Sequence, residues 1–313
     1  MCSFPIKIIL RPFLYQMWVE KYRPKTFNDV SLPEKMKAAI TRIAGKSMPN
    51  MLLYGPAGTG KTSTAHAIVH DLKCKKIEVN ASMHRGIDMI RKIVVPFAQS
   101  KAGVMKVVIL DEADAMTHEA QSALRRVMED NQATTRFFII CNYLAKIIDP
   151  IVSRCSRYHF SPLVPDVMRA RLGEIIEKEN VQIDVDTVNI LMKIGRGDMR
   201  RTIMLLQTCF TSGKGVITSE LIYDESGQIP KDLVETLIGV ETYDDMEEAV
   251  NVCLNRGYTG SQAIHGMLEA YKGSNRSDVV IAMAEADFRL GQGADEYLQL
   301  LAVLCVIKNS NGD

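Results

Sequence analysis

Five short apolar runs in the first half of the chain have the length of buried β-strands. They lie at residues 51–54, 76–80, 106–110, 136–141 and 157–160. Segments with apolar residues at helical spacing precede or separate these runs, at 33–43, 61–72, 86–98 and 118–129. Strands and helices that alternate at these lengths predict an α/β fold, with a parallel sheet covered by helices. Such sheets bind ligands at the carboxyl ends of their strands.

After residue 161 the strand pattern ends and helical patterns alone follow. They lie at about 166–179, 186–194, 198–211 and 231–309. A stretch containing Gly and Pro at 226–230 separates the last of these from the others. We therefore predict an α/β domain and two helical domains, at 17–161, 162–228 and 229–313.

The composition of the 313-residue chain is that of an ordinary globular protein, with 47% hydrophobic and 24% charged residues. Residues 1–16 make a poor signal peptide because charged residues and Pro12 interrupt their apolar run, and we expect a loosely ordered tail. No apolar run approaches the ~20 residues needed to span a bilayer. The seven cysteines lack C-x-x-C spacing, as is typical of reduced thiols in an intracellular protein, and the histidines form no metal-binding pattern.

Charge is distributed unevenly along the chain, although the net charge is only +1. Residues 1–161 carry 24 basic and 13 acidic residues, whereas residues 162–313 carry 14 and 24. A basic half joined to an acidic half indicates that the first half handles a polyanion. The simpler alternative is that some of its lysines only solvate its surface.

The segment Gly55-Pro-Ala-Gly-Thr-Gly-Lys61-Thr62 follows the first predicted strand directly and opens a helix. It fits the pattern G-x-x-x-x-G-K-[ST], in which glycines let backbone amides form a cradle for phosphate oxygens. The N-terminus of the following helix adds partial positive charge. Lys61 is placed to reach the β- and γ-phosphates, and Thr62 to offer its hydroxyl to Mg²⁺. An ordinary glycine turn is the alternative.

The strand at 106–110 ends in Asp111 and Glu112, whose side chains can both turn toward the phosphate site. Asp111 is placed to organise Mg²⁺ partly through water, and Glu112 to orient or deprotonate the attacking water. Apolar strands followed by acids are common, but this one lies about 50 residues after a phosphate-binding lysine. That pairing favours a nucleotide-hydrolysing site that uses Mg²⁺.

The combination of GPAGTGKTSTA, VVILDEADAM and Ser153-Arg154-Cys155 resembles AAA+ clamp-loader ATPases, in particular the small subunits of replication factor C. The likeness extends over about Met17–Leu301 and includes WVEKYRP at 18–24 and the NAS and RGID segments between 80 and 88. It implies an AAA+ P-loop α/β domain followed by a helical lid and a helical collar. The collar would join subunits, although 231–278 matches less well and leaves the collar packing open.

The resemblance implies an ATP site built from several segments. The residues are Val19, Tyr22, Arg23, Pro24, Ser31, Gly55, Pro56, Ala57, Gly58, Thr59, Gly60, Lys61, Thr62, Ser63, Asn142 and Arg200. Asn142 would position the lytic water, and Arg200 would touch the γ-phosphate from the lid. Without the resemblance, Asn142 reads as a turn residue and Arg200 as an exposed helix-start residue. Trp18 and Tyr22 also suit simple packing of the N-terminal segment.

Arg154 has a separate implied role. In the family, the arginine of Ser-Arg-Cys projects to the ATP of the neighbouring subunit as a finger in trans, where such a charge is worth ~10³–10⁵ in rate. This implies an obligate ring or arc and slow hydrolysis by a lone subunit. The alternative is a loop arginine that pairs with a local acid.

Two helices are candidates for DNA contact. In helix 118–129 an apolar stripe faces inward, which leaves Gln121, Arg125 and Arg126 on the other side. The resemblance implies that this helix and helix 86–98 track the template strand, and that the phosphate contacts are Arg85, Arg91 and Thr117. Acidic residues often precede the Arg85 position in the family, but this chain has Met83-His84. A merely solvated basic face is the alternative.

The family also implies that the end of helix 86–98 faces the sliding clamp, through Val95, Pro96 and Phe97. Phe97 is equally well interpreted as a core residue.

We therefore expect a small subunit of a hetero-pentameric clamp loader in the nucleus, with other replication factor C subunits, the sliding clamp (proliferating cell nuclear antigen) and primer-template DNA as partners. Its DNA- and clamp-stimulated ATPase would load the clamp in replication and repair, and no membrane is involved. One alternative is an architectural subunit that binds ATP but hardly hydrolyses it. Another is a DNA-remodelling AAA+ motor, although the acidic second half offers no further DNA-binding module.

Overall fold

The computed structural model describes residues 17–311 except 31, 33, 45–47, 84, 102, 214, 241 and 273–275. The predicted tail at 1–16 and the candidate ATP ligand Ser31 therefore lie outside the described residues. The chain divides into two compact units. The first contains the residues up to Asn180 together with Met192–Gln207, and the second contains Val181–Leu191 and the residues from Thr208 onward.

The first unit is built on a five-stranded parallel sheet with the order β2-β3-β4-β1-β5. The strands are β1 (Met51–Tyr54), β2 (Lys75–Asn80), β3 (Lys106–Asp111), β4 (Thr135–Cys141) and β5 (Ser156–His159). Each lies within two residues of its predicted position at both ends. This parallel sheet confirms the predicted α/β class. Strands such as β3 are near-continuous apolar runs because both faces of the sheet are buried.

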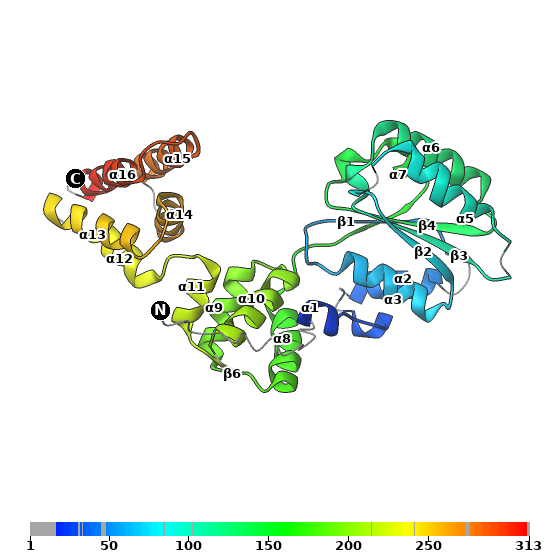
Figure 1. The fold of residues 1–313 in the computed structure, drawn as a ribbon, viewed down its shortest axis with the longest axis horizontal. Coiled ribbons are helices and arrows are strands. Elements are labelled where there is room, and N and C mark those ends of the chain that lie inside the picture. Colours follow the sequence, from blue (N-terminus) through cyan, green and yellow to red (C-terminus); the bar gives the residue numbers. More distant parts are fainter. Residues whose placement is uncertain are drawn as a thin grey trace, which may run out of the picture. The chain divides into compact units, whose positions relative to one another are not determined.

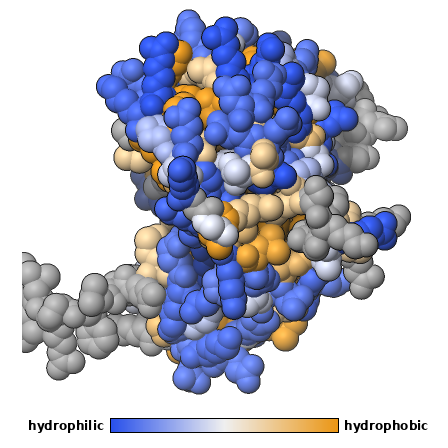
Figure 2. Space-filling view, turned by 90° about the vertical axis from the view of Figure 1, so that its right-hand side faces the viewer, coloured by the Kyte–Doolittle hydropathy of each residue, from blue (hydrophilic) through white to orange (hydrophobic). Residues whose placement is uncertain are grey.

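Helices cover both faces of this sheet, as Figure 1 shows. On one face lie α2 (Glu34–Ala44) and α3 (Lys61–Asp71), and on the other α5 (Val95–Gln99), α6 (His118–Asp130) and α7 (Asp149–Val152). Two cores result, one containing Ile40, Leu53 and Phe138, the other Leu52, Leu124 and Phe137. The face of the molecule seen in Figure 2 is mainly hydrophilic above and below, with an apolar band across its middle.

Several short elements and two longer helices complete the first unit. They are α1 (Trp18–Lys21), η1 (Phe27–Asp29), η3 (Ala113–Ala115), η4 (Leu144–Lys146), α8 (Pro165–Glu179) and most of α10 (Met199–Ser212).

The helix expected at 86–98 differs from its prediction. It consists of α4 (Ile87–Met89), the π-helical segment η2 (Ile90–Val94) and α5. The Val95 amide donates to the Ile90 carbonyl, five residues back instead of four. Pro96 next to it has no amide hydrogen, so the regular hydrogen-bond ladder is interrupted at this point.

The second unit is mainly helical. Its helices are α11 (Ser219–Ser226), α12 (Lys231–Ile238), α13 (Tyr243–Asn255), α14 (Gly260–Ala270), α15 (Ser277–Gly291) and α16 (Glu296–Asn311), with part of α9 (Val185–Gly195). Helices α12–α16 enclose one apolar core that includes Leu237, Met246, Met267 and Leu304. The predicted bounds of the helical lid (162–228) and of the helical collar (229–313) stay predictions.

Sequence patterns missed a small sheet in the second unit. The strands β6 (Gln182–Ile183) and β7 (Val216–Ile217) pair in parallel, so the expectation of helices alone after residue 161 was wrong there. Two-residue strands carry too little alternation to detect. Within the described part of the chain, every helix is too short or too polar to cross a bilayer.

Lys106, at the start of β3, is a buried charge that joins the sheet to the end of α5. Only 2% of the residue is exposed, and its ammonium donates to the carbonyls of Phe97 (3.3 Å), Ala98 and Ser100 (2.7 Å). Burial lowers the pKa of the Lys106 ammonium, and the nearby charge of Lys75 lowers it further. The lysine adds a charged donor to carbonyl groups at a helix C-terminus, where the Phe97 carbonyl also accepts from Ser100 and the Ala98 carbonyl from the Thr135 hydroxyl.

Replacing Lys106 with Met should destabilise the protein although it adds apolar surface. We expect Lys106→Met to lower the free energy of unfolding by about 1–3 kcal/mol, because buried carbonyls lose a charged donor. Urea unfolding followed by circular dichroism measures the change. The control is Lys101→Met at an exposed site, expected to stay within about 0.5 kcal/mol. Equal stability of Lys106→Met and wild type would contradict this assignment.

Candidate nucleotide-binding site

The turn between β1 and α3 requires glycine at two positions. A Cβ on Gly55 would lie 2.0 Å from the Phe160 carbonyl oxygen, and a Cβ on Gly58 would lie 1.7 Å from Asp198 Oδ1. Gly58 also has a φ of +68°, in the left-handed region. The loop therefore passes close to β5 and to the segment before α10, and α3 begins at Lys61. The predicted phosphate cradle has the expected strand, turn and helix.

Lys61 lies folded over this loop. It is 7% exposed, and its ammonium donates to the Gly55 carbonyl at 2.8 Å and to the Pro56 carbonyl at 2.6 Å. Burial lowers the pKa of the Lys61 ammonium, whereas the Asp111 carboxylate opposes that shift. A desolvated cation at the centre of a glycine turn can exchange carbonyl partners for phosphate oxygens.

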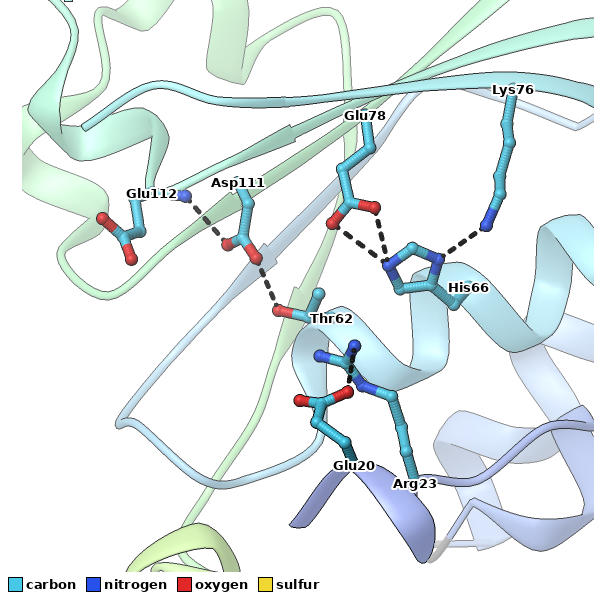
Figure 3. A network of polar contacts seen from close by, with 8 residues as sticks. All are labelled: Glu20, Arg23, Thr62, His66, Lys76, Glu78, Asp111 and Glu112. Atoms are coloured by element: carbon cyan, nitrogen blue, oxygen red, sulfur yellow. Dashed lines mark hydrogen bonds and ion pairs between the residues drawn. The ribbon is translucent and has the colours of Figure 1, made fainter. Parts of the chain in front are cut away.

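Thr62 and Asp111 meet where α3 begins and β3 ends, as Figure 3 shows. The Thr62 hydroxyl donates to Asp111 Oδ2 at 2.9 Å, and the Glu112 amide donates to Asp111 Oδ1 at 2.8 Å. Glu112 has a φ of +51°, so the chain turns sharply after the strand. Such strain in a residue other than glycine is often found at functional sites. The exposed Glu112 carboxylate thus reaches the same pocket as Asp111.

The oxygen atoms of Thr62 and Asp111 fit a Mg²⁺ site of the type completed by nucleotide phosphates and water. Mg²⁺ at such sites needs only one or two protein ligands. Among the described residues, no cluster of three or more His, Cys, Asp or Glu side chains could hold a metal ion by itself.

One pocket of the first unit brings most of the predicted ATP ligands together. From the prediction it is lined by Val19, Tyr22, Arg23, Pro24, Ala57, Gly58, Thr59, Gly60, Lys61, Thr62, Ser63, Asp111, Glu112, Asn142 and Arg200. Gly55 and Pro56 do not line it but hold the Lys61 ammonium through their carbonyls. Five separate segments thus converge on one cavity, although their individual roles stay predictions.

Six residues that line the same pocket were missed from the sequence. They are Asp29, Val30, Leu163, Arg171, Met199 and Ile203. Ile203 lies one helical turn after Arg200, so helix periodicity could have identified it. Arg171 belongs to no sequence motif, and only the fold brings it to the pocket.

The N-terminal segment is attached to α8 by polar contacts beside this pocket. Glu179 Oε1 accepts hydrogen bonds from Lys21 Nζ and from the Tyr22 hydroxyl, each at 2.6 Å. Burial and the Glu179 carboxylate raise the pKa of the Tyr22 phenol. Arg171 donates to the Tyr22 carbonyl, and Trp18 is 5% exposed. The segment therefore packs onto the domain and lines the pocket at the same time.

The segment before α10 contacts the phosphate loop directly. The Met199 amide donates to the Gly58 carbonyl at 3.2 Å, and Asp198 Oδ1 accepts from the Arg201 amide at 3.0 Å in the first turn of α10. Arg200 lies between these two contacts and is exposed toward the pocket that it lines. The start of α10 is thus fixed to the loop that would hold phosphates.

Arg154 does not line this pocket. Its Nη2 lies 2.5 Å from Glu129 Oε1, and its Nη1 donates to the Pro150 carbonyl at 2.7 Å. The local ion pair considered from the sequence is therefore present. The role of Arg154 in trans stays a prediction.

The candidate DNA contacts lie close together. Arg85, Arg91 and Thr117 are all exposed, and the Thr117 amide donates to the Arg85 carbonyl at 3.0 Å. Thr117 also caps α6 by accepting from the Ala120 amide. The residues that precede the two predicted DNA-contacting helices are thus joined by a backbone hydrogen bond, which supports one shared surface.

Gln121 corrects the predicted face of α6. It is 3% exposed rather than on the solvent side with Arg125. Its side-chain amide donates to the Lys146 carbonyl at 3.0 Å and accepts from the Ile148 amide at 2.9 Å. A buried amide that satisfies backbone groups of a neighbouring loop cannot contact DNA. The spacing of residues along the helix did not reveal that Gln121 is buried and Arg125 exposed.

The three candidate clamp contacts differ in burial. Val95 and Phe97 are half-buried and pack against the core, whereas Pro96 is exposed. The contact of Phe97 with the core agrees with its interpretation as a core residue.

A phosphate-binding turn, an Asp-Glu strand end and an arginine from a following helix define a P-loop ATPase of the AAA class. Residues 51–163 match the family described as ATPase family associated with various cellular activities. Residues 228–306 match the replication factor C C-terminal domain.

Full-length relatives identify the family more narrowly. Human replication factor C subunit 4 is 38% identical, with 93% of this chain and 87% of that protein covered. Human subunit 5 is 37% identical (93% and 91%), and the replication factor C small subunit of Picrophilus torridus is 38% identical (94% and 98%). The chain belongs to the replication factor C small-subunit family, which confirms the predicted resemblance.

The predicted likeness of segments 111–130 and 135–148 to the subunit numbered five in animals and three in yeast stays a prediction. The nearly equal identities to human subunits 4 and 5 do not by themselves select one of them. Among solved structures, the Thermotoga maritima RuvB Holliday junction branch migration motor has a TM-score of 0.54 at 17% identity, with 80% of this chain and 91% of that chain covered. This likeness concerns the fold alone.

Because Gly58 lies close to Asp198, we predict that alanine is tolerated less well at Gly58 than at Gly60. Gly58→Ala forces its Cβ against Asp198, whereas Gly60 has a φ of +94° but open space around it. We expect Gly58→Ala to weaken binding of a fluorescent ATP analogue at least about tenfold more than Gly60→Ala, which corresponds to about 1.4 kcal/mol. Fluorescence titration measures this ratio. Equal losses in the two variants would show that Asp198 does not limit the loop.

Proposed function

We propose that this chain is an ATP-hydrolysing small subunit of a hetero-pentameric clamp loader. It would act with other replication factor C subunits in the nucleus, and load a sliding clamp onto primer-template DNA in replication and repair. The observation that carries the proposal is the convergence of the phosphate loop, the Asp-Glu strand end and Arg200 on one pocket in a chain of this family.

In this proposal, each side chain of the pocket has a part in hydrolysis. Lys61 binds the β- and γ-phosphates, and the glycine turn supplies backbone amides. Thr62 and Asp111 hold Mg²⁺, which when bound neutralises charge on the phosphates. Glu112 orients and deprotonates the attacking water, and Asn142 fixes its position. Val19, Tyr22, Arg23 and Pro24 border the adenine.

Arg200 and Arg154 act on different nucleotides in this proposal. Arg200 contacts the γ-phosphate bound by its own chain, and the contact between Met199 and Gly58 makes α10 respond to that phosphate. Arg154 is outside its own pocket and would serve the nucleotide of a neighbouring subunit, where a finger is worth ~10³–10⁵ in rate. Hydrolysis then requires assembly, and the clamp and DNA stimulate it by favouring the closed arrangement.

DNA would be bound through its phosphates without sequence readout. Arg85, Arg91 and Thr117 form an exposed surface at the start of two neighbouring helical segments. Phosphate contacts of this kind position a protein on nucleic acid. Val95, Pro96 and Phe97 are the candidate clamp contacts, and the exposed ring of Pro96 is the most accessible of the three.

The alternative of a purely architectural ATP-binding subunit can be tested at Glu112. In the assembled complex, Glu112→Gln should retain ATP binding but lower clamp- and DNA-stimulated turnover, because the amide cannot accept the proton of water. Turnover is measured by phosphate release and binding by nucleotide titration. The matched control is Glu119→Gln, an exposed acid on α6. Unchanged turnover and clamp loading in Glu112→Gln would favour the architectural subunit.

The DNA surface predicts a change in salt dependence. Arg91→Ala should weaken binding of the complex to primed DNA and reduce the slope of log K against log[salt] by about 0.7–0.9, since one phosphate contact is lost. Arg85→Ala should behave alike. Arg42→Ala, an exposed arginine on α2, should leave the slope unchanged. The slope is measured by DNA-binding titrations at several salt concentrations. An unaltered slope in both test variants would show that this surface does not contact DNA phosphates.

A further inference from the structure

The Arg154 side chain is held at two points by its own chain. Its Nη2 lies 2.5 Å from Glu129 Oε1 on α6, and its Nη1 donates to the Pro150 carbonyl on α7. The same Glu129 oxygen accepts from Arg125 Nε at 3.1 Å. Hydrogen bonding and charge from Arg125, together with Arg154, lower the pKa of the Glu129 carboxyl. Glu129 is therefore an ionised partner shared by two arginines.

These contacts leave part of the guanidinium available. The group has five N–H donors in one plane, and the contacts to Glu129 and Pro150 involve one nitrogen each. The Arg154 side chain remains 37% exposed. A guanidinium anchored along one part of its edge can still bind an oxyanion along the rest, and its long stem has fewer accessible rotamers than that of a free arginine.

The strength of the contact also suits a positioning role. Both partners are partly exposed, so solvent screens the ion pair and it contributes little to stability. The pair is thus too weak to compete strongly with a phosphate for the cation. It is sufficient to favour one orientation of the guanidinium before a phosphate arrives, and preorganised charge is more effective in catalysis than charge that must be ordered during the reaction.

We propose that Glu129 is a positioning residue for Arg154: it fixes the guanidinium so that its free edge meets the nucleotide of the neighbouring subunit. This inference rests on the proposed function, because it requires that Arg154 acts in trans. Glu129 does not line the nucleotide pocket of its own chain. Since the exposed Thr117 caps the N-terminus of α6 and Glu129 lies in its last turn, one helix connects the candidate DNA surface to the arginine.

The test compares the Arg154-dependent part of turnover, defined as the difference between wild-type and Arg154→Ala complexes. At saturating ATP, clamp and primed DNA, Glu129→Ala should lower that part about tenfold, since small misplacements of a catalytic group have effects of this size. The KM for ATP should hardly change. Glu129→Gln keeps an acceptor oxygen at the same reach and should lose less. In the Arg154→Ala background, neither substitution should have a further effect.

Three outcomes are distinguishable. Asp130→Asn, at the exposed neighbouring position, is the control and should behave as wild type in assembly and turnover. If Glu129→Ala fails to assemble, Glu129→Gln carries the comparison. Unchanged or increased Arg154-dependent turnover in the Glu129 variants would overturn the positioning role. Wild-type turnover in Arg154→Ala itself would instead overturn the trans assignment in the proposed function.

Discussion

The close approach of the β1–α3 turn to its surroundings is the constraint on which the site depends. Gly55 lies against the end of β5 and Gly58 against the segment before α10, so the turn has little freedom. Lys61 is held over it by two carbonyls. Buried strands on both sides fix the position of the turn, and Thr62 meets Asp111 because β3 ends beside the start of α3. Local backbone geometry therefore sets the chemistry of the pocket.

The same geometry brings other segments of the chain into contact with the pocket. The N-terminal segment reaches it through Tyr22, which is tied to Glu179. The start of α10 reaches it through Met199 and carries Arg200. On the other face of the sheet, α6 joins Thr117 at one end to Glu129 at the other. The phosphate loop thus has direct contact with the start of α10, and the N-terminal segment lines the same pocket.

Sequence patterns predicted the five strands and most helices because the apolar runs are long and bounded by turn residues. Local motifs predicted the turn that ends at Thr62 and the Asp111-Glu112 strand end, whereas the family resemblance implied the other pocket residues. Sequence patterns failed where tertiary context decides. Gln121 has the spacing of an exposed residue but is buried by a loop that needs its amide. Arg171 reaches the pocket only through the fold, and the π-helical turn before Pro96 depends on a missing donor.

The central claim is that ATP is bound by one chain and hydrolysed with a cation from the next. Single-turnover hydrolysis of bound ATP by the isolated chain, compared with the assembled complex, tests this claim most directly. The account predicts that the isolated chain binds ATP but hydrolyses it at least about 10³-fold more slowly, as expected for a site that lacks its finger. Equal rates in the isolated chain and the complex would contradict it.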